Sequence, residues 1–219
     1  MPGRLIAISD IHGCSKAFGA VLEAIDPRPA DTLITLGDYI DRGPDSQGAM
    51  AMLLHLAGRC NLVPLLGNHD EVLLDLVDGE TELLLGWMRF GGGATLRSYQ
   101  CQRPDEIPPR HIDFLRGCRL FHETRRHFFV HGSYHEDIPL EEQPREVLLW
   151  ENLRGRQPGR HVSGKTAIVG HTSQPDGEIL DLGHIKCIDT CCYGRGWLTA
   201  MEVGTGRIWQ ADKKGKIRR

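Results

Sequence analysis

The sequence lacks an apolar run long enough to cross a membrane, and it lacks an excess of basic residues. The apolar stretch near the N-terminus, residues 5–8, is far too short for a signal peptide or a transmembrane helix. Lys and Arg number 26 against 29 Asp and Glu, a formal net charge of -3. Binding to a nucleic-acid backbone normally needs a basic surface. We therefore expect no membrane and no nucleic-acid polymer among the partners, and the sequence leaves the oligomeric state open.

Paired cysteine motifs are also lacking. The chain has seven cysteines, an odd number. The densest group, Cys187, Cys191 and Cys192, contains none of the C-x-x-C pairs that are typical of a structural zinc site. We interpret the cysteines as reduced thiols. Reduced thiols and the lack of a secretion signal both favour the cytoplasm.

The length and composition are those of one ordinary globular domain. With 219 residues, of which 40% are hydrophobic and 25% charged, the chain can build a single sizeable core, and disorder is disfavoured. Apolar runs at 5–9, 32–36 and 62–64 alternate with two segments of helical spacing, which predicts a βαβαβ unit. We expect one domain over residues 1–219, with a helical insertion at about 71–118.

Further strand signals follow the insertion. Short apolar runs separated by turn residues indicate strands, and we expect these runs to form a second sheet. They lie at residues 120–123, 128–130, 167–169, 185–188, 198–202 and 207–210. The basic tail, residues 213–219, is expected to fray.

A polar cluster follows each strand of the first unit. The clusters are DIHG (10–13), GDYIDRG (37–43) and GNHD (67–70). In an open α/β sheet, ligands bind at the carboxyl ends of the parallel strands. Three clusters at that edge therefore predict one site rather than three.

Side chains in these clusters, with two later histidines, are suited to binding metal ions. The six candidate ligands are Asp10, His12, Asp38, Asn68, His131 and His171. The two later histidines also follow apolar runs, so the second sheet is expected to complete the site. Mixed carboxylate, amide and imidazole donors suit Mn, Fe or Zn better than Mg or Ca. We predict two divalent ions, manganese first with Fe or Zn as alternatives, and Asp38 as the bridging carboxylate.

The same segments carry a resemblance to a known family. SDIHG (9–13), GDYIDRG (37–43) and GNHD (67–70) resemble the signature blocks of bacterial phosphoprotein phosphatases, within the calcineurin-like metallophosphoesterases. Weaker matches lie at 131–132 and 170–171. Residues 187–199 look like the C-terminal strand and loop of bacterial members, including diadenosine tetraphosphatase relatives. The resemblance implies a four-layer α/β/β/α sandwich.

The resemblance also implies roles for the residues beside the ligands. A hydroxide formed at the two metal ions would attack phosphorus, and His69 would protonate the leaving group as general acid. Asp41 would hold the imidazole of His69 in the right tautomer. Arg42 would bind the phosphate through its planar guanidinium.

The match departs from the bacterial pattern after His131. Many members have Trp-x-Arg in the segment that follows, whereas this chain has WEN at 150–152. A second phosphate-binding arginine is therefore either absent or supplied by Arg154 or Arg156, and we take Arg154 as the candidate. Tyr193 is a further candidate for the phosphate pocket, with packing as its alternative role.

The insertion holds a group of aromatic and glycine residues. Trp87 and Phe90 precede three glycines at 91–93. Both a lid or substrate wall and ordinary helix packing are consistent with the aromatics, while the glycines favour movement.

Two activities compete for this site. The first is a phosphomonoesterase that acts on phosphoserine or phosphothreonine, with phosphotyrosine as an extension; the alternative is a bis(5'-nucleosyl)-tetraphosphatase. Serine leaves as a very basic alkoxide and needs an acid such as His69, whereas a nucleotide leaves as a phosphate and needs less help. Symmetrical tetraphosphatases often resemble GDLVARG at 37–43, without the second Asp. The presence of Asp41 therefore favours the protein phosphatase, with a phosphorylated protein or small phosphoester as substrate. A non-catalytic phosphate-recognition module is disfavoured because the ligand set is intact.

Overall fold

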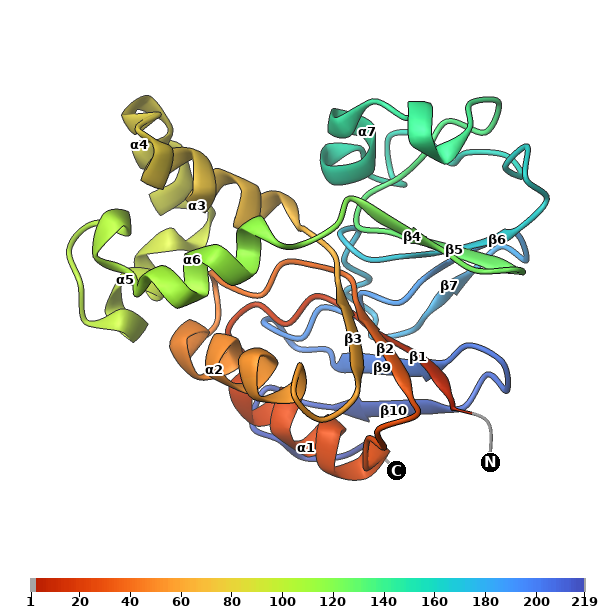
Figure 1. Ribbon diagram of the computed structural model, residues 1–219, viewed down its shortest axis with the longest axis horizontal. Coiled ribbons are helices and arrows are strands. Elements are labelled where there is room, and N and C mark those ends of the chain that lie inside the picture. Colours follow the sequence, from red (N-terminus) through yellow and green to blue (C-terminus); the bar gives the residue numbers. More distant parts are fainter. Residues whose placement is uncertain (1–2, 219) are drawn as a thin grey trace.

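The computed structural model describes residues 3–218 and contains two five-stranded sheets. The first sheet has the strand order β10-β9-β1-β2-β3 and the second the order β4-β5-β6-β8-β7 (Figure 1). The first sheet consists of β1 (Leu5–Ile8), β2 (Thr32–Thr35), β3 (Asn61–Pro64), β9 (Leu198–Glu202) and β10 (Ile208–Ala211). The second consists of β4 (Phe121–Glu123), β5 (His127–Val130), β6 (Thr166–Val169), β7 (Leu180–Asp181) and β8 (Ile185–Cys187).

The predicted βαβαβ unit is confirmed, and the assignment of the last two strands is corrected. β1, β2 and β3 are parallel neighbours and are joined by α1 (Ser15–Ile25) and α2 (Ser46–Leu56). β9 and β10, which the sequence placed in the second sheet, instead extend the first sheet, because β9 pairs antiparallel with β1. An apolar run reveals a strand but not its partner, so the sequence could not distinguish the two sheets.

Alternating side chains along the strands build the layers. In β1, Ile6 and Ile8 point into the core under the helices, while Ala7 points into the core between the two sheets. In β5, Phe129 faces that inter-sheet core and its neighbours Phe128 and Val130 face the outer side. Strands buried on both faces explain why the sequence shows continuous apolar runs rather than a polar alternation.

Helices cover the outer faces of both sheets. α1 and α2 lie on the outer face of the first sheet, and α7 (Arg145–Trp150) lies over the second (Figure 1). The resulting α/β/β/α arrangement confirms the predicted four-layer sandwich, with a thin fourth layer that also includes η4 (Leu140–Glu142). The order of layers brings the carboxyl ends of the central strands of both sheets to one side of the molecule.

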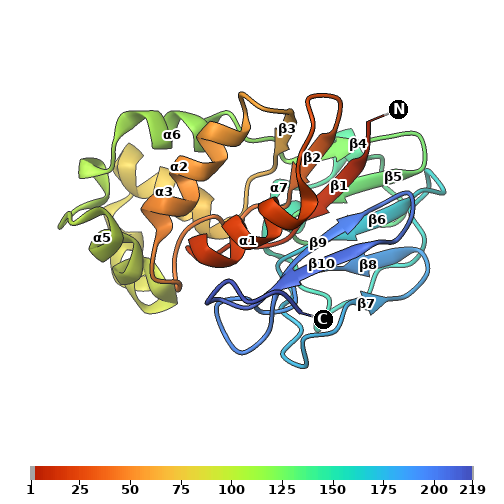
Figure 2. The same ribbon diagram turned by 90° about the horizontal axis from the view of Figure 1, so that it is seen from below.

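The segment between β3 and β4 is helical and lies beside the sandwich. Figures 1 and 2 show its helices grouped at one end of the molecule, beyond the sheets. They are α3 (Asn68–Asp78), η1 (Thr81–Leu83), α4 (Leu84–Trp87), the π-helical turn η2 (Met88–Gly92), α5 (Gly93–Tyr99), η3 (Pro104–Glu106) and α6 (Pro109–Arg116). This group corresponds to the helical insertion expected at about 71–118.

The basic tail is ordered up to Arg218, contrary to the expectation that it frays; Arg219 lies outside the described residues. Ile217 pairs with Ala211, and Asp212 Oδ1 accepts hydrogen bonds from the N–H groups of Lys214 and Lys216, both at 2.9 Å. A tight turn held in this way keeps residues 212–217 against the end of β10. Within residues 3–218, no helix has the length and apolar character needed to span a bilayer.

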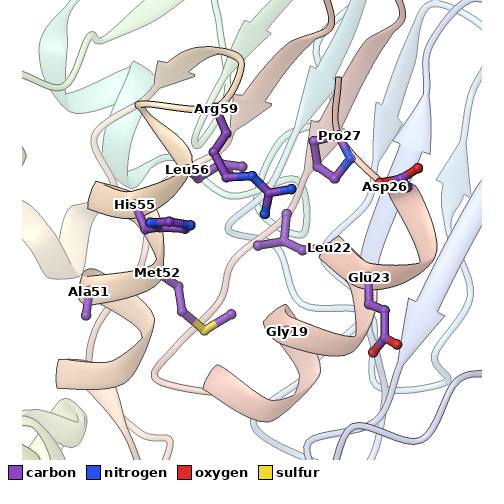
Figure 3. Close-up of a pocket in the computed structure, with 10 residues that line it drawn as sticks. All are labelled: Gly19, Leu22, Glu23, Asp26, Pro27, Ala51, Met52, His55, Leu56 and Arg59. Carbon is purple, nitrogen blue, oxygen red and sulfur yellow. The ribbon is translucent and has the colours of Figure 1, made fainter. Parts of the chain in front are cut away.

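A groove lies between α1 and α2, on the helical layer of the first sheet (Figure 3). It has a volume of about 570 Å³, and its apolar walls include Leu22, Met52 and Leu56. His55, Glu23 and Arg59 add polar atoms at its sides. None of the candidate metal ligands or phosphate-binding residues borders this groove, so it is separate from the chemistry described below.

An ion pair joins the start of the first sheet to the end of α1. Asp31, which is buried, accepts hydrogen bonds from Arg4 Nε at 3.1 Å and from the backbone N–H of Arg4 at 2.8 Å. Arg4 also donates to the carbonyl oxygens of Ile25 and Asp26. Burial opposes the charge of Asp31, but the hydrogen bonds from Arg4 and from the N–H of Arg28 lower the pKa of Asp31 to about 2.

We expect Asp31→Asn to lower the free energy of unfolding by about 1–2 kcal/mol at pH 7, after allowance for solvent screening. Because the folded-state pKa of Asp31 lies below the unfolded value, the carboxylate stabilises the fold above about pH 4, and this contribution is lost as the pH falls toward about 2. The deficit of the variant should therefore shrink over that window in urea titrations.

The matched control is Asp105→Asn, because Asp105 pairs with Arg103 at 2.9 Å but both side chains are more than half exposed. An exposed pair contributes about 0–1 kcal/mol, so this variant should stay close to the wild type. Two results would contradict the stabilising role of the Asp31 carboxylate. One is an equal loss of unfolding free energy in the two variants, and the other is a deficit in Asp31→Asn that does not change between pH 5 and about 2.

Candidate metal centre

Loops from both sheets bring the six candidate ligands together. Three loops follow β1, β2 and β3, and two follow β5 and β6, so each ligand comes directly or almost directly after a strand. These loops carry Asp10, His12, Asp38, Asn68, His131 and His171. All but His171, which is partly exposed, are buried. The edge where the two sheets meet is therefore lined by polar atoms, and the apolar core on either side offers them no hydrogen-bond partners.

Asp38 lies at the centre of this cluster. Its Oδ2 is 3.3 Å from His12 Nε2, and its Oδ1 is 3.5 Å from His131 Nε2. Two overlapping groups of potential ligands can hold a metal ion, and both contain Asp38: one adds His12 and His69, the other His131 and His171. Within each group the ligand atoms lie within 4.8 Å of one another.

Asn68 connects the histidines of the second group. Its Oδ1 is 3.0 Å from His131 Nε2 and 3.0 Å from His171 Nδ1. The side-chain oxygen therefore faces the same point as the two imidazoles. A carbonyl oxygen and two ring nitrogens converging in this way are a suitable donor set for a divalent ion.

Each of the three ligand imidazoles is oriented by a backbone carbonyl oxygen. His12 Nδ1 lies 2.9 Å from Ile40 O, His131 Nδ1 lies 2.7 Å from Leu36 O, and His171 Nε2 lies 3.1 Å from the carbonyl of Trp150. A carbonyl can only accept, so these nitrogens carry the proton. The other nitrogen of each ring is left with its lone pair toward the cluster, which is the arrangement that metal-binding histidines adopt.

Asp10 is held at the junction between the sheets. The N–H of His171, in the loop after β6, lies 3.0 Å from Asp10 Oδ2 and 3.2 Å from Oδ1. A Cβ at Gly170 would lie 2.2 Å from Asp10 Oδ1, so only glycine allows the loop to come this close. This contact fixes the loop of the second sheet to the first ligand of the chain.

The loops adopt a backbone conformation that side chains usually avoid. Positive φ angles occur at His12 (45°), Asp38 (52°), Asp41 (70°), Arg42 (66°) and His171 (60°). Each such residue costs about 1–3 kcal/mol, and residues of this kind gather at functional sites. Backbone hydrogen bonds hold the strained turns, since Asp38 O accepts from the N–H groups of Ile11 and His12 at 3.0 and 2.8 Å.

The electrostatics of the cluster favour a bound cation. Burial, and next the charges of Asp189 and Asp38, raise the pKa of Asp10 well above its usual range. Burial lowers the pKa of His12 well below its usual value and that of His171 to about 4. Both imidazoles are therefore neutral near pH 7, which is the form that binds metal. A buried carboxyl group among neutral imidazoles lacks a positive partner, and a divalent ion can supply that positive charge.

His69 and Asp41 form a buried pair beside the ligands. His69 Nδ1 is 2.7 Å from Asp41 Oδ2, and both side chains are almost completely buried. The backbone N–H of His69 also donates to Asp38 Oδ1 at 3.0 Å, which ties this pair to the centre of the cluster. Among residues 3–218, no side chain or backbone group hydrogen-bonds His69 Nε2, whereas Nδ1 is occupied by Asp41.

Two residues of the helical insertion hold Asp41 in place. Trp87 Nε1 donates to Asp41 Oδ2 at 2.9 Å, and Thr95 Oγ1 donates to Asp41 Oδ1 at 2.6 Å. The sequence indicated only a wall or a packing role for Trp87, and it gave no signal for Thr95. The one related signal was Asp41 itself, in GDYIDRG. A carboxylate that becomes buried needs hydrogen-bond donors, and these must come from elsewhere in the chain.

Arg42 lies over the cluster, supported by Tyr193. Its Nη1 is 2.9 Å from His12 Nε2, and its guanidinium carbon is 4.5 Å from the centre of the Tyr193 ring. The Tyr193 ring also contacts that of His12 edge to face, with centroids 4.9 Å apart. Tyr193, which was considered for either packing or phosphate binding, thus packs under the guanidinium that faces the site.

The glycines of the insertion allow close packing. Gly91 has φ 122°, and its carbonyl accepts from the N–H of Arg42 at 3.3 Å. A Cβ at Gly91 would lie 2.7 Å from Arg42 N, and one at Gly92 would lie 2.2 Å from the Trp87 ring. Two of the three glycines are therefore required by contacts with Arg42 and Trp87. The expectation that they mark a moving segment has no support in this geometry.

The two arginines considered for a second phosphate contact lie apart from Arg42. Arg154 is exposed and donates to the carbonyl oxygen of Ser173. Arg156 pairs with Glu136 and with Glu151. Neither borders the pockets that Arg42 lines. A phosphate contact from Arg154 remains a prediction that would need its side chain to leave Ser173.

An apolar pocket opens beside the candidate ligands. It has a volume of about 310 Å³ and is bordered by Asn68, His69 and His171 on the polar side. Its other walls are Val72, Trp87, Phe90 and Trp150, of which Phe90 and Trp150 are exposed. The pocket therefore offers an apolar surface directly beside the candidate ligands, as small-molecule sites commonly do.

Comparison with known proteins agrees with this geometry. Residues 3–196 match the family model for calcineurin-like phosphoesterases. Serine/threonine-protein phosphatase 1 of Salmonella typhimurium is 27% identical over 205 residues, covering 90% of each chain. The symmetrical bis(5'-nucleosyl)-tetraphosphatase of Cellvibrio japonicus is 26% identical over 271 residues, covering 93% of this chain and 97% of that protein.

A solved structure has the same fold. The crystal structure of a candidate diadenosine tetraphosphatase superimposes with a TM-score of 0.73 at 23% identity, covering 96% of this chain and 95% of the other. The family match covers every candidate ligand and all strands of the two sheets except β9 and β10. The chain therefore belongs to the calcineurin-like phosphoesterase family, whose members hydrolyse phosphoesters at a dinuclear metal centre.

Proposed function

We propose that this protein hydrolyses phosphomonoesters with the help of two divalent ions, and that its substrates are phosphoserine and phosphothreonine side chains of proteins, with phosphotyrosine as an extension. Asp38 is the bridging ligand in this proposal, because its two oxygens face different histidines. Asp10 and His12 would complete one ion site, and Asn68, His131 and His171 the other. Manganese is the proposed metal, with Fe or Zn as alternatives, since the donors mix oxygen and imidazole nitrogen.

The residues around the metals have separate tasks. When bound, the two ions supply positive charge for the phosphate oxygens and lower the pKa of a water to about 7. Arg42 binds the phosphate from the open side, where its planar guanidinium can contact two oxygens at once. The ring of Tyr193 packs against this guanidinium, with 4.5 Å between the guanidinium carbon and the ring centre.

The observation that carries the proposal is the buried pair of His69 and Asp41. Asp41 accepts from Trp87 and Thr95 as well as from His69, so the carboxylate is fixed in position and His69 Nδ1 keeps its proton. The free Nε2 of His69 can then carry a second proton to the leaving oxygen. Serine and threonine leave as strongly basic alkoxides, for which such an acid matters most.

A second candidate function is symmetrical dinucleoside tetraphosphate hydrolysis. Several relatives carry that name. The aromatic walls of the apolar pocket, Trp87, Phe90 and Trp150, would also suit a nucleobase. A nucleotide leaves as a phosphate, however, and has less need of the His69 and Asp41 pair.

The proposed setting is the cytoplasm. All seven cysteines are free thiols in the structure. Cys14, Cys187 and Cys192 are buried. Reduced cysteines are usual in that compartment, and the proposed partners are phosphorylated proteins or small phosphoesters.

The role of His69 as general acid predicts a dependence on the leaving group. We expect His69→Asn to lower kcat/KM for a phosphoserine peptide by about 10²- to 10⁴-fold, and to have a much smaller effect on p-nitrophenyl phosphate, whose leaving group needs little protonation. Asp41→Asn should show the same pattern to a lesser degree. The measurement is steady-state kinetics with both substrates.

The control for this series is His55→Asn, an exposed histidine in the distal groove. It should leave both substrates unaffected. Equal losses on the peptide and on p-nitrophenyl phosphate in His69→Asn would show that His69 acts before the leaving-group step, and the acid role would be wrong.

The choice between the two candidate functions rests on a direct comparison. Manganese-loaded protein is assayed with a phosphothreonine peptide and with diadenosine tetraphosphate under the same conditions. The proposal predicts a kcat/KM for the peptide at least about tenfold higher, a transition-state preference of about 1.4 kcal/mol. A reversed ratio would assign the chain to dinucleoside tetraphosphate hydrolysis.

A further inference from the structure

A second pocket beside the metal centre has basic walls, and it shares Arg42 with the apolar pocket. It has a volume of about 520 Å³, and the residues around it include Arg42, Arg97, Lys213, Ser98 and Tyr193. Three of these side chains are cations, and they come from distant parts of the chain: the loop after β2, helix α5 and the turn after β10. Within residues 3–218, no Asp or Glu borders this site, which we name the basic pocket.

The three cations have no carboxylate partner of their own. In the described part of the chain, no Asp or Glu oxygen lies within 4.0 Å of a side-chain nitrogen of Arg42, Arg97 or Lys213. Arg156 and Arg218, by contrast, each pair with a glutamate. All three cations of the basic pocket are exposed. Like charges around one pocket repel one another, and an anion that enters from solvent relieves this repulsion.

The acids nearest in sequence to the three cations are engaged in other contacts. Asp45 is the N-cap of α2, and its carboxylate accepts from the N–H of Gly48 at 2.9 Å and from the hydroxyl of Ser15 at 2.6 Å. It also accepts from the hydroxyl of Ser98, at the wall of the basic pocket, over a longer 3.5 Å. Asp212 accepts from two N–H groups of the turn after β10. Both carboxylates thus stabilise backbone turns rather than pair with a cation of the pocket.

Lys213 is brought to the pocket by the fold of the tail. Its ammonium donates to the carbonyl oxygen of Tyr193 at 3.5 Å. The turn that carries Lys213 has Gly215 at φ 88°, and it returns through Ile217 to pair with Ala211. The tail therefore adds a cation to the basic pocket, although the sequence alone indicated a frayed end.

Arg42 connects the basic pocket to the metal centre. Its Nη1 lies 2.9 Å from His12 Nε2, while its guanidinium packs on the Tyr193 ring that borders the basic pocket. A phosphate at the ligands is therefore next to Arg42, and the polypeptide that carries this phosphate extends away from it. Successive residues of an extended chain advance by about 3.3 Å, so residues up to three positions from the phosphorylated one lie within about 10 Å of it along the chain. Side chains at these positions are close enough to reach a pocket beside Arg42.

We propose that the basic pocket binds an acidic side chain, Asp or Glu, that neighbours the phosphorylated residue of a protein substrate, so that the enzyme prefers phosphoserine and phosphothreonine in acidic segments. The inference rests on the proposed phosphomonoesterase function and adds a determinant of substrate choice to it. A carboxylate accepts two parallel hydrogen bonds from a guanidinium and has further lone pairs for an ammonium. The substrate thereby supplies the negative charge that the residues around the pocket lack.

The first test compares phosphothreonine peptides that differ only in their charge. One has Asp on the amino-terminal side of the phosphothreonine, one has Asp on the carboxyl-terminal side, and one has Asn on both sides. Manganese-loaded protein is assayed with each peptide at about 0.05 M salt, where screening is weak. We expect one of the two acidic peptides to have a kcat/KM at least about fivefold above that of the Asn peptide, mainly through a lower KM. The advantage should shrink as the salt concentration rises.

Two double variants and a matched control assign the preference to the pocket. Arg97→Gln/Lys213→Gln should bring the acidic and Asn peptides to within about twofold of each other, and Arg97→Glu/Lys213→Glu should favour a peptide with Lys in place of Asp. The control, Arg89→Gln/Lys214→Gln, removes two exposed cations of the insertion and the tail that do not border the pocket, and it should keep the wild-type ratio. Equal loss of the preference in both glutamine variants would mean that only the net charge matters, and the proposed site would be wrong.

The second test measures binding apart from turnover, so that a failure of this inference can be told from a failure of the proposed function. Fluorescence anisotropy gives the Kd of each labelled peptide for manganese-loaded His69→Asn. We expect one acidic peptide to bind at least about fivefold more tightly than the Asn peptide, and the addition of Arg97→Gln/Lys213→Gln to abolish the difference. If the wild type hydrolyses none of the peptides, the proposed function is wrong, while this titration still decides whether the pocket selects acidic segments. Equal binding of all three peptides overturns the inference.

Discussion

One buried carboxylate, Asp38, determines how the rest of the site is built. Its two oxygens face imidazoles that come from different sheets, so the sandwich must bring the loops after β1, β2 and β5 to a single point. Its backbone carbonyl holds the loop after β1, and its Oδ1 accepts from the N–H of His69. The strained left-handed turns at Asp38, His12 and Asp41 are a consequence of this convergence. A buried negative group at that position is stable only with cations around it.

Much of the fold, and the grouping of most candidate ligands, could be predicted because the strands can be recognised in the sequence. Apolar runs that end in Asp, His or Asn mark the carboxyl edge of a sheet, and that rule alone gathers Asp10, Asp38 and Asn68. The strand with which each strand pairs could not be predicted in this way. The run at 198–202 has the same apolar character whether it lies in the first or the second sheet, and its place beside β1 is decided by packing of Leu198 and Ala200 under α1.

The parts that could not be predicted depend on contacts between distant segments. Thr95 is an ordinary helix residue in the sequence, yet its hydroxyl holds Asp41, 54 positions away. The glycines at 91 and 92 suggested movement, but each makes room for a neighbour, Arg42 or Trp87. Lys213 lay in a tail without any pattern and is carried to Arg42 by a turn around Asp212. Local patterns report the conformation of a segment, whereas these roles depend on what that segment touches.

The most direct test of the shared carboxylate is the metal content of the protein with and without it. Wild type and Asp38→Asn, which keeps the size of the side chain, are loaded with manganese, freed of unbound metal and subjected to elemental analysis, with exposed Asp105→Asn as control. If Asp38 bridges two ions, the wild type and the control hold about two per chain, and Asp38→Asn loses at least one while its circular dichroism spectrum is unchanged. A manganese content in Asp38→Asn equal to that of the wild type would contradict the bridging role of Asp38.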